Sequence, residues 1–327
     1  MFEIAVCLSS NNFYAQHLGA AVASILKVKN KDEFIKIYII DGGISEENKK
    51  RLMFFELNYD CKIIFVKPDE ERLKNCVIYK GAHVSIATFY RCLIPEIIPN
   101  ESKIIYLDSD TIVRTSLREI FQTDMGENLV YGVADVAEDA NKKRLGLDKY
   151  VNAGVLLFNC DLMRKENFVD KMFSWMVDNM DKIFAYDQDL INKVAAGRIE
   201  YLDDKYNAQV RRVGATRFDN LLEPAILHFI SPKKPWSYWK PLNQTPWAFE
   251  YFKALEGTPW SAFICEYKFK SMLLYPFRVL YPSGGYGKFL KKIFSIRNSS
   301  DTNIKKVTIL GFQFKIKRTR FVKKNAL

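Results

Sequence analysis

The stretch Lys103–Asp110, Lys-Ile-Ile-Tyr-Leu-Asp-Ser-Asp, is a short apolar run that ends in two acidic residues. Such a run is typical of a strand that is buried on both faces of a parallel sheet. Residues two apart in an extended chain point to the same side, so Asp108 and Asp110 face the same way. Their carboxylates repel each other unless a cation lies between them, and hard oxygen ligands suit Mg²⁺ or Mn²⁺. The stretch therefore predicts a buried strand with a divalent-metal site at its end, and the alternative is a solvated turn.

Short apolar runs and helical patterns alternate on both sides of this stretch. Ala15–Val28 and Ser45–Leu57 have the periodicity of helices, and Ser45 followed by Asn48 is a capping-box pattern. This alternation predicts an α/β fold with a mainly parallel, Rossmann-like sheet flanked by helices. Ligands of such sheets bind beyond the carboxyl ends of the strands, so polar residues after strands are the site candidates. The other predicted strands are Glu3–Leu8, Lys36–Ile40, Lys62–Val66, Leu129–Ala134 and Gly154–Asn159.

Charge divides the chain into two parts. The net charge is +11, but Glu266–Leu327 carries 15 Lys and Arg residues against two acids, while the remainder has 34 against 36. We therefore predict a large domain over residues 1–260 and a basic, aromatic-rich extension over residues 261–327. In the extension, Tyr286–Ile296 has the pattern of a basic amphipathic helix, and residues 307–316 alternate like a hairpin around Gly311. The extension is expected to bind an anionic membrane surface, and the alternative is a merely solvated appendage.

Cysteine usage and hydropathy indicate a protein of the reducing cytosol. The six cysteines are scattered, without a close pair that would predict a zinc site or a redox motif. Most lie in apolar runs, as buried thiols do. The chain starts with a strand-like run rather than a signal peptide, and Lys or Arg interrupts every long apolar stretch. We expect a cytoplasmic location, with peripheral attachment to the inner face of the cytoplasmic membrane.

A histidine far along the chain is a candidate third metal ligand. His228 follows the short apolar run 225–227 and precedes Lys234, a cation suited to bind an anion. A site that mixes carboxylates with imidazole favours Mn²⁺ over Mg²⁺. The alternative is a histidine whose hydrogen bonds are satisfied within the core.

Two further segments are site candidates. Val151–Asn159 enters its predicted strand through small residues, which lets a bulky ligand approach the backbone. Asp187 and Gln188 start a predicted helix that runs to Val194. Asp187 is accordingly either a site residue or an N-cap.

Taken in order, these motifs resemble glycosyltransferase family 8, the retaining enzymes that include bacterial lipopolysaccharide galactosyl- and glucosyltransferases and, more distantly, glycogenin. The resemblance covers Glu3–Trp236, and several ordered motifs are far more specific than any one of them. It implies a GT-A-type catalytic domain and a UDP-hexose-dependent transferase that uses Mn²⁺, with Mg²⁺ as the alternative ion. The segments that carry it are Ile40–Ser45, His83–Arg91, Tyr106–Asp110, Asn152–Asn159, Asp187–Asp189 and His228–Trp236.

The resemblance also implies roles for single residues. Asp108, Asp110 and His228 match the metal ligands, and the metal would bridge the diphosphate of UDP. Ser231, where relatives often have glycine, and Lys234 match the segment that contacts this diphosphate. The residues that match those around the donor sugar are Arg91, Asn152, Ala153, Asp187 and Gln188, while Asp135 corresponds to an acid near the sugar and the acceptor.

The resemblance places the uridine against the loop after the first strand. The expected contacts there are Cys7, Ser9, Asn12 and Tyr14, together with Ser109 of the Asp-Ser-Asp motif. Many relatives have an acidic residue in this loop, where this chain has Ser-Ser-Asn-Asn from position 9.

The implied reaction transfers galactose or glucose from a UDP-sugar to a lipopolysaccharide core, a lipid-linked oligosaccharide or another surface glycan. Charge that develops on UDP would be stabilised by the metal and by Lys234. Gln188 is a poor nucleophile, so same-face attack is favoured over a covalent intermediate. The alternatives are a glycogenin-like chain that glycosylates its own tyrosine and a catalytically silent UDP-sugar-binding protein. Basic charge confined to the extension argues against nucleic acid as a partner, and the sequence assigns no oligomeric state.

Overall fold

A computed structural model describes the chain as two compact units. The first comprises Met1–Trp236 and Leu242–Cys265, and the second comprises Ser237–Pro241 and Glu266–Leu327. All predicted site residues belong to the first unit. The structure describes residues 1–74, 76, 78, 85–210, 223–231, 234–237 and 247–272 in full, and the backbone of residues 273–280, 294–298, 304–309 and 312–317.

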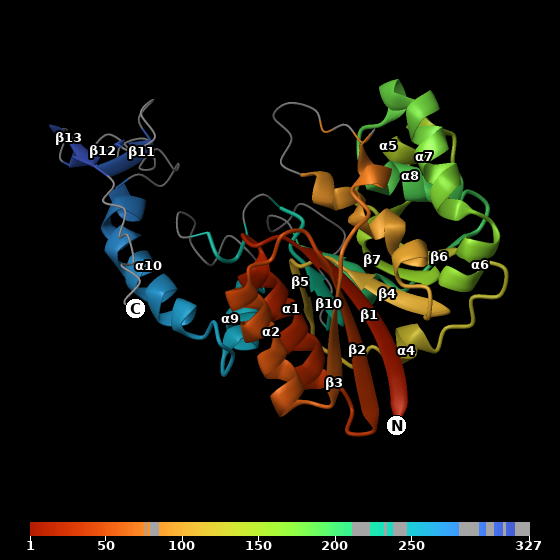
Figure 1. Cartoon of the computed structure of the whole chain (residues 1–327), viewed down its shortest axis with the longest axis horizontal. Coiled ribbons are helices and arrows are strands. Elements are labelled where there is room, and N and C mark those ends of the chain that lie inside the picture. The colour runs from red at the N-terminus through yellow and green to blue at the C-terminus, as the bar shows by residue number, and fades with distance from the viewer. Residues whose placement is uncertain are drawn as a thin grey trace, which may run out of the picture. The chain divides into compact units, whose positions relative to one another are not determined.

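The first unit is built on a seven-stranded sheet in the order β3-β2-β1-β4-β7-β6-β8 (Figure 1). All of its strands run in one direction except β7, which is antiparallel to both of its neighbours. Parallel neighbours need crossover connections, and the helices provide them. The strands are β1 (Phe2–Ser10), β2 (Glu33–Asp41), β3 (Cys61–Val66), β4 (Lys103–Leu107), β6 (Val130–Ala134), β7 (Val151–Asn159) and β8 (Ile199–Tyr201).

Helices cover both faces of this sheet, which explains why its strands are almost continuously apolar. From β1, Ile4 and Val6 pack into a core with α1, α2 and α9, whereas Ala5 and Cys7 pack into a second core with α6, α7 and α8. Figure 1 shows these two groups of helices on opposite sides of the sheet. The helices of this unit are α1 (Ala15–Val28), α2 (Glu46–Asn58), α3 (Ile94–Ile97), α4 (Arg118–Phe121), α5 (Glu138–Leu145), α6 (Cys160–Lys165), α7 (Phe168–Asp178), α8 (Asp187–Val194) and α9 (Ala248–Leu255), with 3₁₀ turns at Glu71–Leu73, Ile86–Leu93, Met180–Lys182 and Asp204–Asn207.

A small sheet in the order β5-β10-β9 brings distant segments to the end of β4. Its strands are β5 (Thr111–Val113), β9 (Ala208–Gln209) and β10 (Ile226–His228). Strand β10 is antiparallel to β5, so His228 lies opposite Thr111. The backbone N–H of Phe229 donates to the carbonyl of Asp110 at 3.0 Å. This register places His228 beside the Asp-Ser-Asp motif.

The strands and helices predicted for the first unit are confirmed. Each predicted strand overlaps an observed one, and α1 has the predicted bounds. Ser45 Oγ accepts a hydrogen bond from the backbone N–H of Asn48 at 3.3 Å, as a cap of α2 does. Strands β5, β8 and β9 were missed because two or three residues are too few to show a periodicity.

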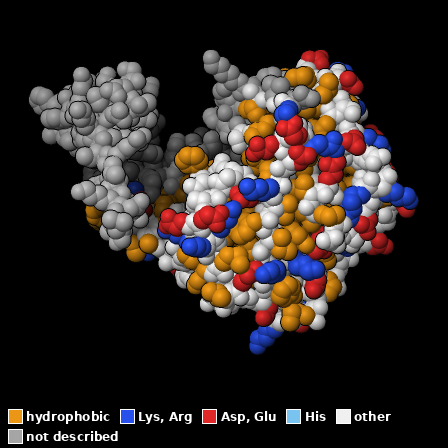
Figure 2. Space-filling view, viewed as in Figure 1, with side chains coloured by type: hydrophobic (Ala, Val, Ile, Leu, Met, Phe, Trp, Pro, Cys, Tyr) orange, Lys and Arg blue, Asp and Glu red, His pale blue; other side chains and the backbone are white. Residues whose placement is uncertain are grey.

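The surface of the first unit mixes both signs of charge. Figure 2 shows Lys and Arg side chains interspersed with Asp and Glu side chains over its visible face.

All six cysteines are free thiols, and Cys7, Cys61, Cys92 and Cys160 are buried, as expected for thiols in apolar runs.

The second unit contains most of α10 (Ala262–Leu280) and an antiparallel sheet of β11 (Phe294–Asn298), β12 (Ile304–Ile309) and β13 (Phe312–Lys317). The predicted hairpin is confirmed, because Ile309 of β12 lies opposite Phe312 of β13. The predicted helix Tyr286–Ile296 is wrong at its end, since residues 294–296 pair with β12, and the rest of it lies outside the described residues. In the described part of the chain, no helix combines the length and apolarity that a bilayer crossing requires.

Candidate active site

The three predicted metal ligands converge at the ends of β4 and β10. Asp108 and Asp110 follow β4, and His228 is the last residue of β10. One ligand atom from each lies within 4.8 Å of the other two. His228 Nε2 is 3.6 Å from Oδ2 of Asp108 and 3.3 Å from Oδ1 of Asp110. The three donors therefore face one point, as ligands of a divalent cation do.

Gly154 of β7 makes room for this arrangement. A Cβ on Gly154 would lie 2.7 Å from each ring nitrogen of His228, so the imidazole packs against bare backbone. The Asp108 and Asp110 side chains remain 24% and 15% exposed, which lets a cation reach them from solvent. Two carboxylates, one imidazole and a glycine that accommodates the ring together fit Mn²⁺ or Mg²⁺.

Protein cations flank the two carboxylates. Lys234 Nζ lies 2.5 Å from Oδ2 of Asp110, and an Arg91 guanidinium nitrogen lies 2.9 Å from Oδ1 of Asp108. Burial favours the neutral form of both carboxyls, but Arg91 and Lys234 outweigh it and hold the pKa of Asp108 and that of Asp110 below their usual range. Both are therefore ionised at neutral pH, which is the state that binds a metal.

His228 lies between the carboxylate pair and a buried amide. Burial alone would lower the pKa of His228, but the carboxylates of Asp110 and Asp108 raise it to about 9. On the other side of the ring, Nδ1 is 3.0 Å from Oδ1 of Asn207. Because a metal binds neutral imidazole, coordination at Nε2 would release a proton.

Arg91 connects the metal site to the start of α8. This buried side chain places Nε 2.8 Å from Oδ2 of Asp187, and its guanidinium lies 4.6 Å from the ring centroid of Tyr106. Asp187 also accepts a hydrogen bond from the hydroxyl of Thr88. Burial raises the pKa of Asp187 to about 6, although Arg91 acts in the opposite direction. The N-cap of α8 is Tyr186, so the N-cap interpretation of Asp187 is wrong.

A strained turn precedes α8. Tyr186 has a φ of 49°, a left-handed value that costs a non-glycine residue of order 1–3 kcal/mol. The buried Asp189 holds this turn, because its Oδ2 accepts from the backbone N–H groups of Phe184 and Ala185 at 2.8 and 2.9 Å. The turn fixes where the two following residues, Asp187 and Gln188, enter the site.

A hydrogen-bond network joins the residues predicted around the donor sugar. Asn152 Nδ2 donates to Oδ2 of Asp135 at 3.0 Å and to Oε1 of Gln188 at 3.3 Å. The same Gln188 oxygen accepts from the backbone N–H of Ala153 at 2.9 Å, and Gln188 Nε2 donates to the hydroxyl of Tyr150 at 3.2 Å. Four predicted residues from three separate segments thus form one connected group.

Some residues predicted to contact the uridine lie near the metal ligands. Ser9 Oγ is 3.1 Å from the hydroxyl of Tyr106, and Ser109 Oγ donates to the carbonyl of Ser9 at 2.7 Å. The phenol of Tyr14 has a raised pKa, chiefly because of burial, and the nearby charges that act on it include Lys234 and Asp110. Ser9, Ser109 and Tyr14 therefore lie near the metal ligands, and their contacts with uridine stay predictions.

The other residues predicted to contact UDP have different surroundings. The thiol of Cys7 is fully buried in the second core. Asn12 Oδ1 accepts from the backbone N–H of Ser45 and from Asn48 Nδ2, both at 2.9 Å, so this side chain supports the start of α2. Ser231 is half-buried and follows β10 on the segment that leads to Lys234. Ligand contacts of Cys7, Asn12 and Ser231 stay predictions.

Three further residues complete the site, and none of them has a role predicted from the sequence. Thr88 binds Asp187, and Tyr150 binds Gln188. Asn207, which is fully buried, contacts His228 and has no motif around it. Thr88 lies inside the segment 83–91 that was singled out, so only Tyr150 and Asn207 lacked any signal in the sequence.

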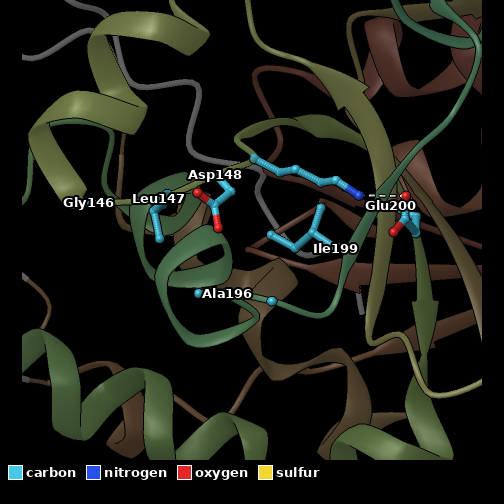
Figure 3. A pocket seen from close by; sticks show the side chains of 8 residues that line it. Gly146, Leu147, Asp148, Ala196, Ile199 and Glu200 are labelled. Atoms are coloured by element: carbon cyan, nitrogen blue, oxygen red, sulfur yellow. Dashed lines mark ion pairs between the residues drawn. The ribbon is translucent and has the colours of Figure 1, made fainter.

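A separate pocket of about 280 Å³ contains none of the predicted site residues. Figure 3 shows it, with the ion pair of Lys149 and Glu200, in which the charged atoms are 2.6 Å apart. Its lining residues are Gly146, Leu147, Asp148, Lys149, Ala196, Gly197, Ile199 and Glu200.

Comparison with known proteins agrees with this geometry. The model of the family described as Glycosyl transferase family 8 matches residues 4–240. General stress protein A of Bacillus subtilis (strain 168) is 29% identical over 255 residues, which cover 72% of this chain and 88% of that protein. The lipopolysaccharide 1,3-galactosyltransferase of Salmonella typhimurium (strain LT2) is 25% identical over 254 residues, which cover 73% of this chain and 74% of that protein.

A solved structure shows the same fold. The galactosyltransferase LgtC, in complex with donor and acceptor sugar analogues, matches with a TM-score of 0.69 at 24% identity. The match covers 80% of this chain and 100% of that one.

Proposed function

Since the chain belongs to glycosyl transferase family 8 and has the GT-A fold, we propose that it is a retaining enzyme that transfers a hexose from a UDP-sugar to a bacterial surface glycan. Family membership makes it a sugar transferase. The lipopolysaccharide 1,3-galactosyltransferase among its relatives supports galactose or glucose as the sugar and a lipopolysaccharide core as the acceptor. The observation that carries the proposal is the convergence of Asp108, Asp110 and His228 beside Lys234.

These residues suit the binding of a diphosphate leaving group. Asp108, Asp110 and His228 would hold Mn²⁺, or Mg²⁺ as the alternative, and the ion would supply Lewis acidity towards the diphosphate. Lys234 adds a second positive charge at the same place, where it would stabilise the charge that develops on UDP. Arg91 keeps the carboxylate of Asp108 ionised and oriented.

The contacts of Asp187 and Gln188 support same-face attack with retention. A covalent intermediate needs a free nucleophilic oxygen close to the sugar. The Asp187 carboxylate is paired with Arg91 and accepts from Thr88, and the amide oxygen of Gln188 accepts from Ala153 and Asn152. We therefore assign to Asp187 and Gln188 the positioning of the sugar, and to Asp135 a role near the sugar and the acceptor.

The second unit supports a place at a membrane that carries the acceptor. Its strands β12 and β13 contain Lys305, Lys306, Lys315 and Lys317, and the region from Glu266 onward has 15 basic residues against two acids. Each basic residue near an anionic leaflet is worth about 1 kcal/mol, so a fraction of them gives reversible attachment. We propose peripheral association with the inner face of the cytoplasmic membrane.

A donor screen tests the proposed function. The purified chain is incubated with UDP-glucose, UDP-galactose or GDP-mannose, each with rough lipopolysaccharide, and release of the nucleotide is measured with Mn²⁺, with Mg²⁺ and with EDTA. We expect acceptor-dependent release of UDP with one UDP-hexose and Mn²⁺, and none with EDTA. Intact mass after the reaction distinguishes transfer to the acceptor from self-glycosylation. Turnover that EDTA leaves unchanged would contradict the metal-dependent mechanism.

A further inference from the structure

Asn207 lies between the metal site and the residues predicted around the donor sugar. It ends the 3₁₀ turn Asp204–Asn207 and is fully buried. Its Oδ1 is 3.0 Å from Nδ1 of His228, and its Nδ2 donates to Oδ1 of Asn152 at 3.0 Å. Each end of one amide thus contacts a different part of the site.

The chemistry of the neighbouring groups fixes the direction of the hydrogen bonds that link Asn152, Asn207 and His228. The backbone N–H of Gly154 can only donate, and it donates to Oδ1 of Asn152 at 3.0 Å. At the other end of the amide, Nδ2 of Asn152 donates to Oδ2 of Asp135 at 3.0 Å. The orientation of the Asn152 amide is therefore determined from both of its ends, and its Oδ1 is an acceptor.

The same logic extends to the imidazole. Since Oδ1 of Asn152 accepts, the group that faces it must be the NH₂ of Asn207, which leaves Oδ1 of Asn207 towards His228. An amide oxygen only accepts, so Nδ1 of His228 must carry the proton. In the neutral ring, Nε2 then has the free lone pair, and Nε2 is the nitrogen that faces Asp108 and Asp110.

We propose that Asn207 is a positioning residue that holds His228 in the tautomer able to bind the metal through Nε2, and that ties this tautomer to the orientation of Asn152. The inference rests on the proposed metal-dependent function. Asn207 is not one of the three converging ligand residues, and it acts through its contacts with His228 and Asn152. A partner of this kind fixes the ring and raises the basicity of the ligand, and loss of such a partner typically weakens metal binding 10- to 100-fold.

A neighbouring side chain provides a matched control. Gln209, two positions further on, is an equally buried amide. Within the described part of the chain, its side chain bonds to backbone groups: Oε1 accepts from the Val136 N–H at 3.1 Å, and Nε2 donates to the carbonyl of Ala134 at 2.8 Å. Gln209→Met removes a buried amide from β9, the strand that directly follows Asn207. The substitution keeps the backbone pairing of Gln209 with His228 and removes only the side-chain bonds to Val136 and Ala134.

The first test measures Mn²⁺ affinity of the full chain by electron paramagnetic resonance of the free ion. We expect Asn207→Leu to weaken binding 10- to 100-fold, and Gln209→Met to leave it unchanged. Asn207→Asp keeps an acceptor for Nδ1 but offers no donor to Asn152. It should therefore keep the Mn²⁺ affinity and lose UDP-sugar turnover. Wild-type affinity in Asn207→Leu, or equal losses in Asn207→Leu and Gln209→Met, would overturn the role of Asn207.

The second test needs no variant of Asn207 and so does not depend on whether such variants fold. The chain has three histidines, and ¹⁵N-histidine NMR with diamagnetic Mg²⁺ distinguishes the tautomers of each, with His17→Gln and His83→Gln used for assignment. A protonated Nδ1 on His228 supports the proposal, and an unprotonated Nδ1 overturns it. A wild-type chain that binds neither Mn²⁺ nor Mg²⁺ would overturn the metal-dependent function itself, whereas tight binding with the other tautomer overturns only the role of Asn207.

Discussion

Gly154 packs directly against the imidazole of His228. Only a residue without a side chain fits at this position. A Cβ on Gly154 would lie 2.7 Å from each ring nitrogen of His228, well inside van der Waals contact. The backbone of β7 therefore forms one wall of the metal site. The sequence indicated only that small residues at this entry would let a ligand come close, and the structure shows that the close neighbour is a side chain of the protein itself.

Substitution of Gly154 should therefore impair metal binding strongly and leave the chain folded. We expect Gly154→Ala to displace the imidazole and to abolish UDP release, with a loss of stability of about 1–3 kcal/mol from overpacking. Thermal unfolding measures the stability, and Mn²⁺ titration of the folded variant measures the site. Normal Mn²⁺ affinity in Gly154→Ala would show that His228 is not a ligand in this geometry.

Removal of either carboxylate charge, at Asp108 or at Asp110, should lower turnover without disrupting the fold. Asp108→Asn or Asp110→Asn removes a ligand charge at a partly exposed position, so turnover should fall on the order of 10²-fold or more while circular dichroism stays unchanged. The measurement is UDP release at saturating Mn²⁺. Unimpaired turnover of a well-folded double variant would rule the metal site out.

Arg91 should be irreplaceable by lysine. Its guanidinium holds Asp108 and Asp187 at once through different nitrogens, 2.9 and 2.8 Å away, which a single ammonium cannot reproduce. Loss of one charged hydrogen bond is worth about 1.5–3 kcal/mol, so Arg91→Lys should lower kcat/KM roughly ten- to a hundredfold.

Arg164 offers the matched control for this substitution. It donates to the backbone carbonyls of Pro95, Ile98 and Glu101 and contacts none of the predicted site residues. Arg164→Lys should cost stability and leave kcat/KM unchanged. Equal kinetic losses in Arg91→Lys and Arg164→Lys would mean that Arg91 acts through the general fold.

Stability should fall in acid partly because of His17. Burial lowers the pKa of His17 from 6.5 to about 3, and its ring stacks on Trp236 with the centroids 3.7 Å apart. Below pH 6.5 the unfolded chain binds a proton at this position and the folded chain does not. The stability contributed at higher pH is thus lost as pH falls from 6.5 towards 3, by about 1.4 kcal/mol per unit.

The difference in unfolding free energy between the wild type and His17→Gln, measured from pH 4 to 8, isolates this effect from other titrating groups. We expect the difference to shrink steadily below pH 6.5. A pKa of His17 near its ordinary value, measured by NMR, would contradict the explanation.

Charges in β12 and β13 should control attachment to membranes. We expect the full chain to bind vesicles that contain phosphatidylserine, and binding to weaken with salt because the attraction is electrostatic. Replacement of Lys305, Lys306, Lys315 and Lys317 by Gln should weaken binding by a few kcal/mol at most. Co-sedimentation measures it, and equal binding to neutral vesicles would exclude an electrostatic surface role.

Much of the fold was predictable because the sheet is covered on both faces. An apolar run such as Lys103–Leu107 marks a buried strand wherever it occurs, and the periodicity of Ala15–Val28 marks a helix, so both were located with their observed bounds. The end of the predicted helix Tyr286–Ile296 was misplaced because pairing with β12, a tertiary contact, overrode a helical pattern in residues 294–296.

The candidate site was predictable only in part. Asp108 and Asp110 were found because two acids at the end of a strand are a local signal. The place of Asn12 was not predictable, because its bonds to Ser45 and Asn48 depend on how α2 packs beside the loop after β1. Asn207 carried no signal at all, since an isolated asparagine near a turn is ordinary.

The sequence by itself determined which segments become strands and helices and that the carboxylates of Asp108 and Asp110 share a side, because both depend on geometry within a few residues. Tertiary structure alone decided that His228 and Asn207 join them. Backbone hydrogen bonds of the β5-β10-β9 ladder set that register across more than a hundred residues. No local pattern encodes such a pairing, since its free energy comes from contacts that exist only after the chain has closed on itself.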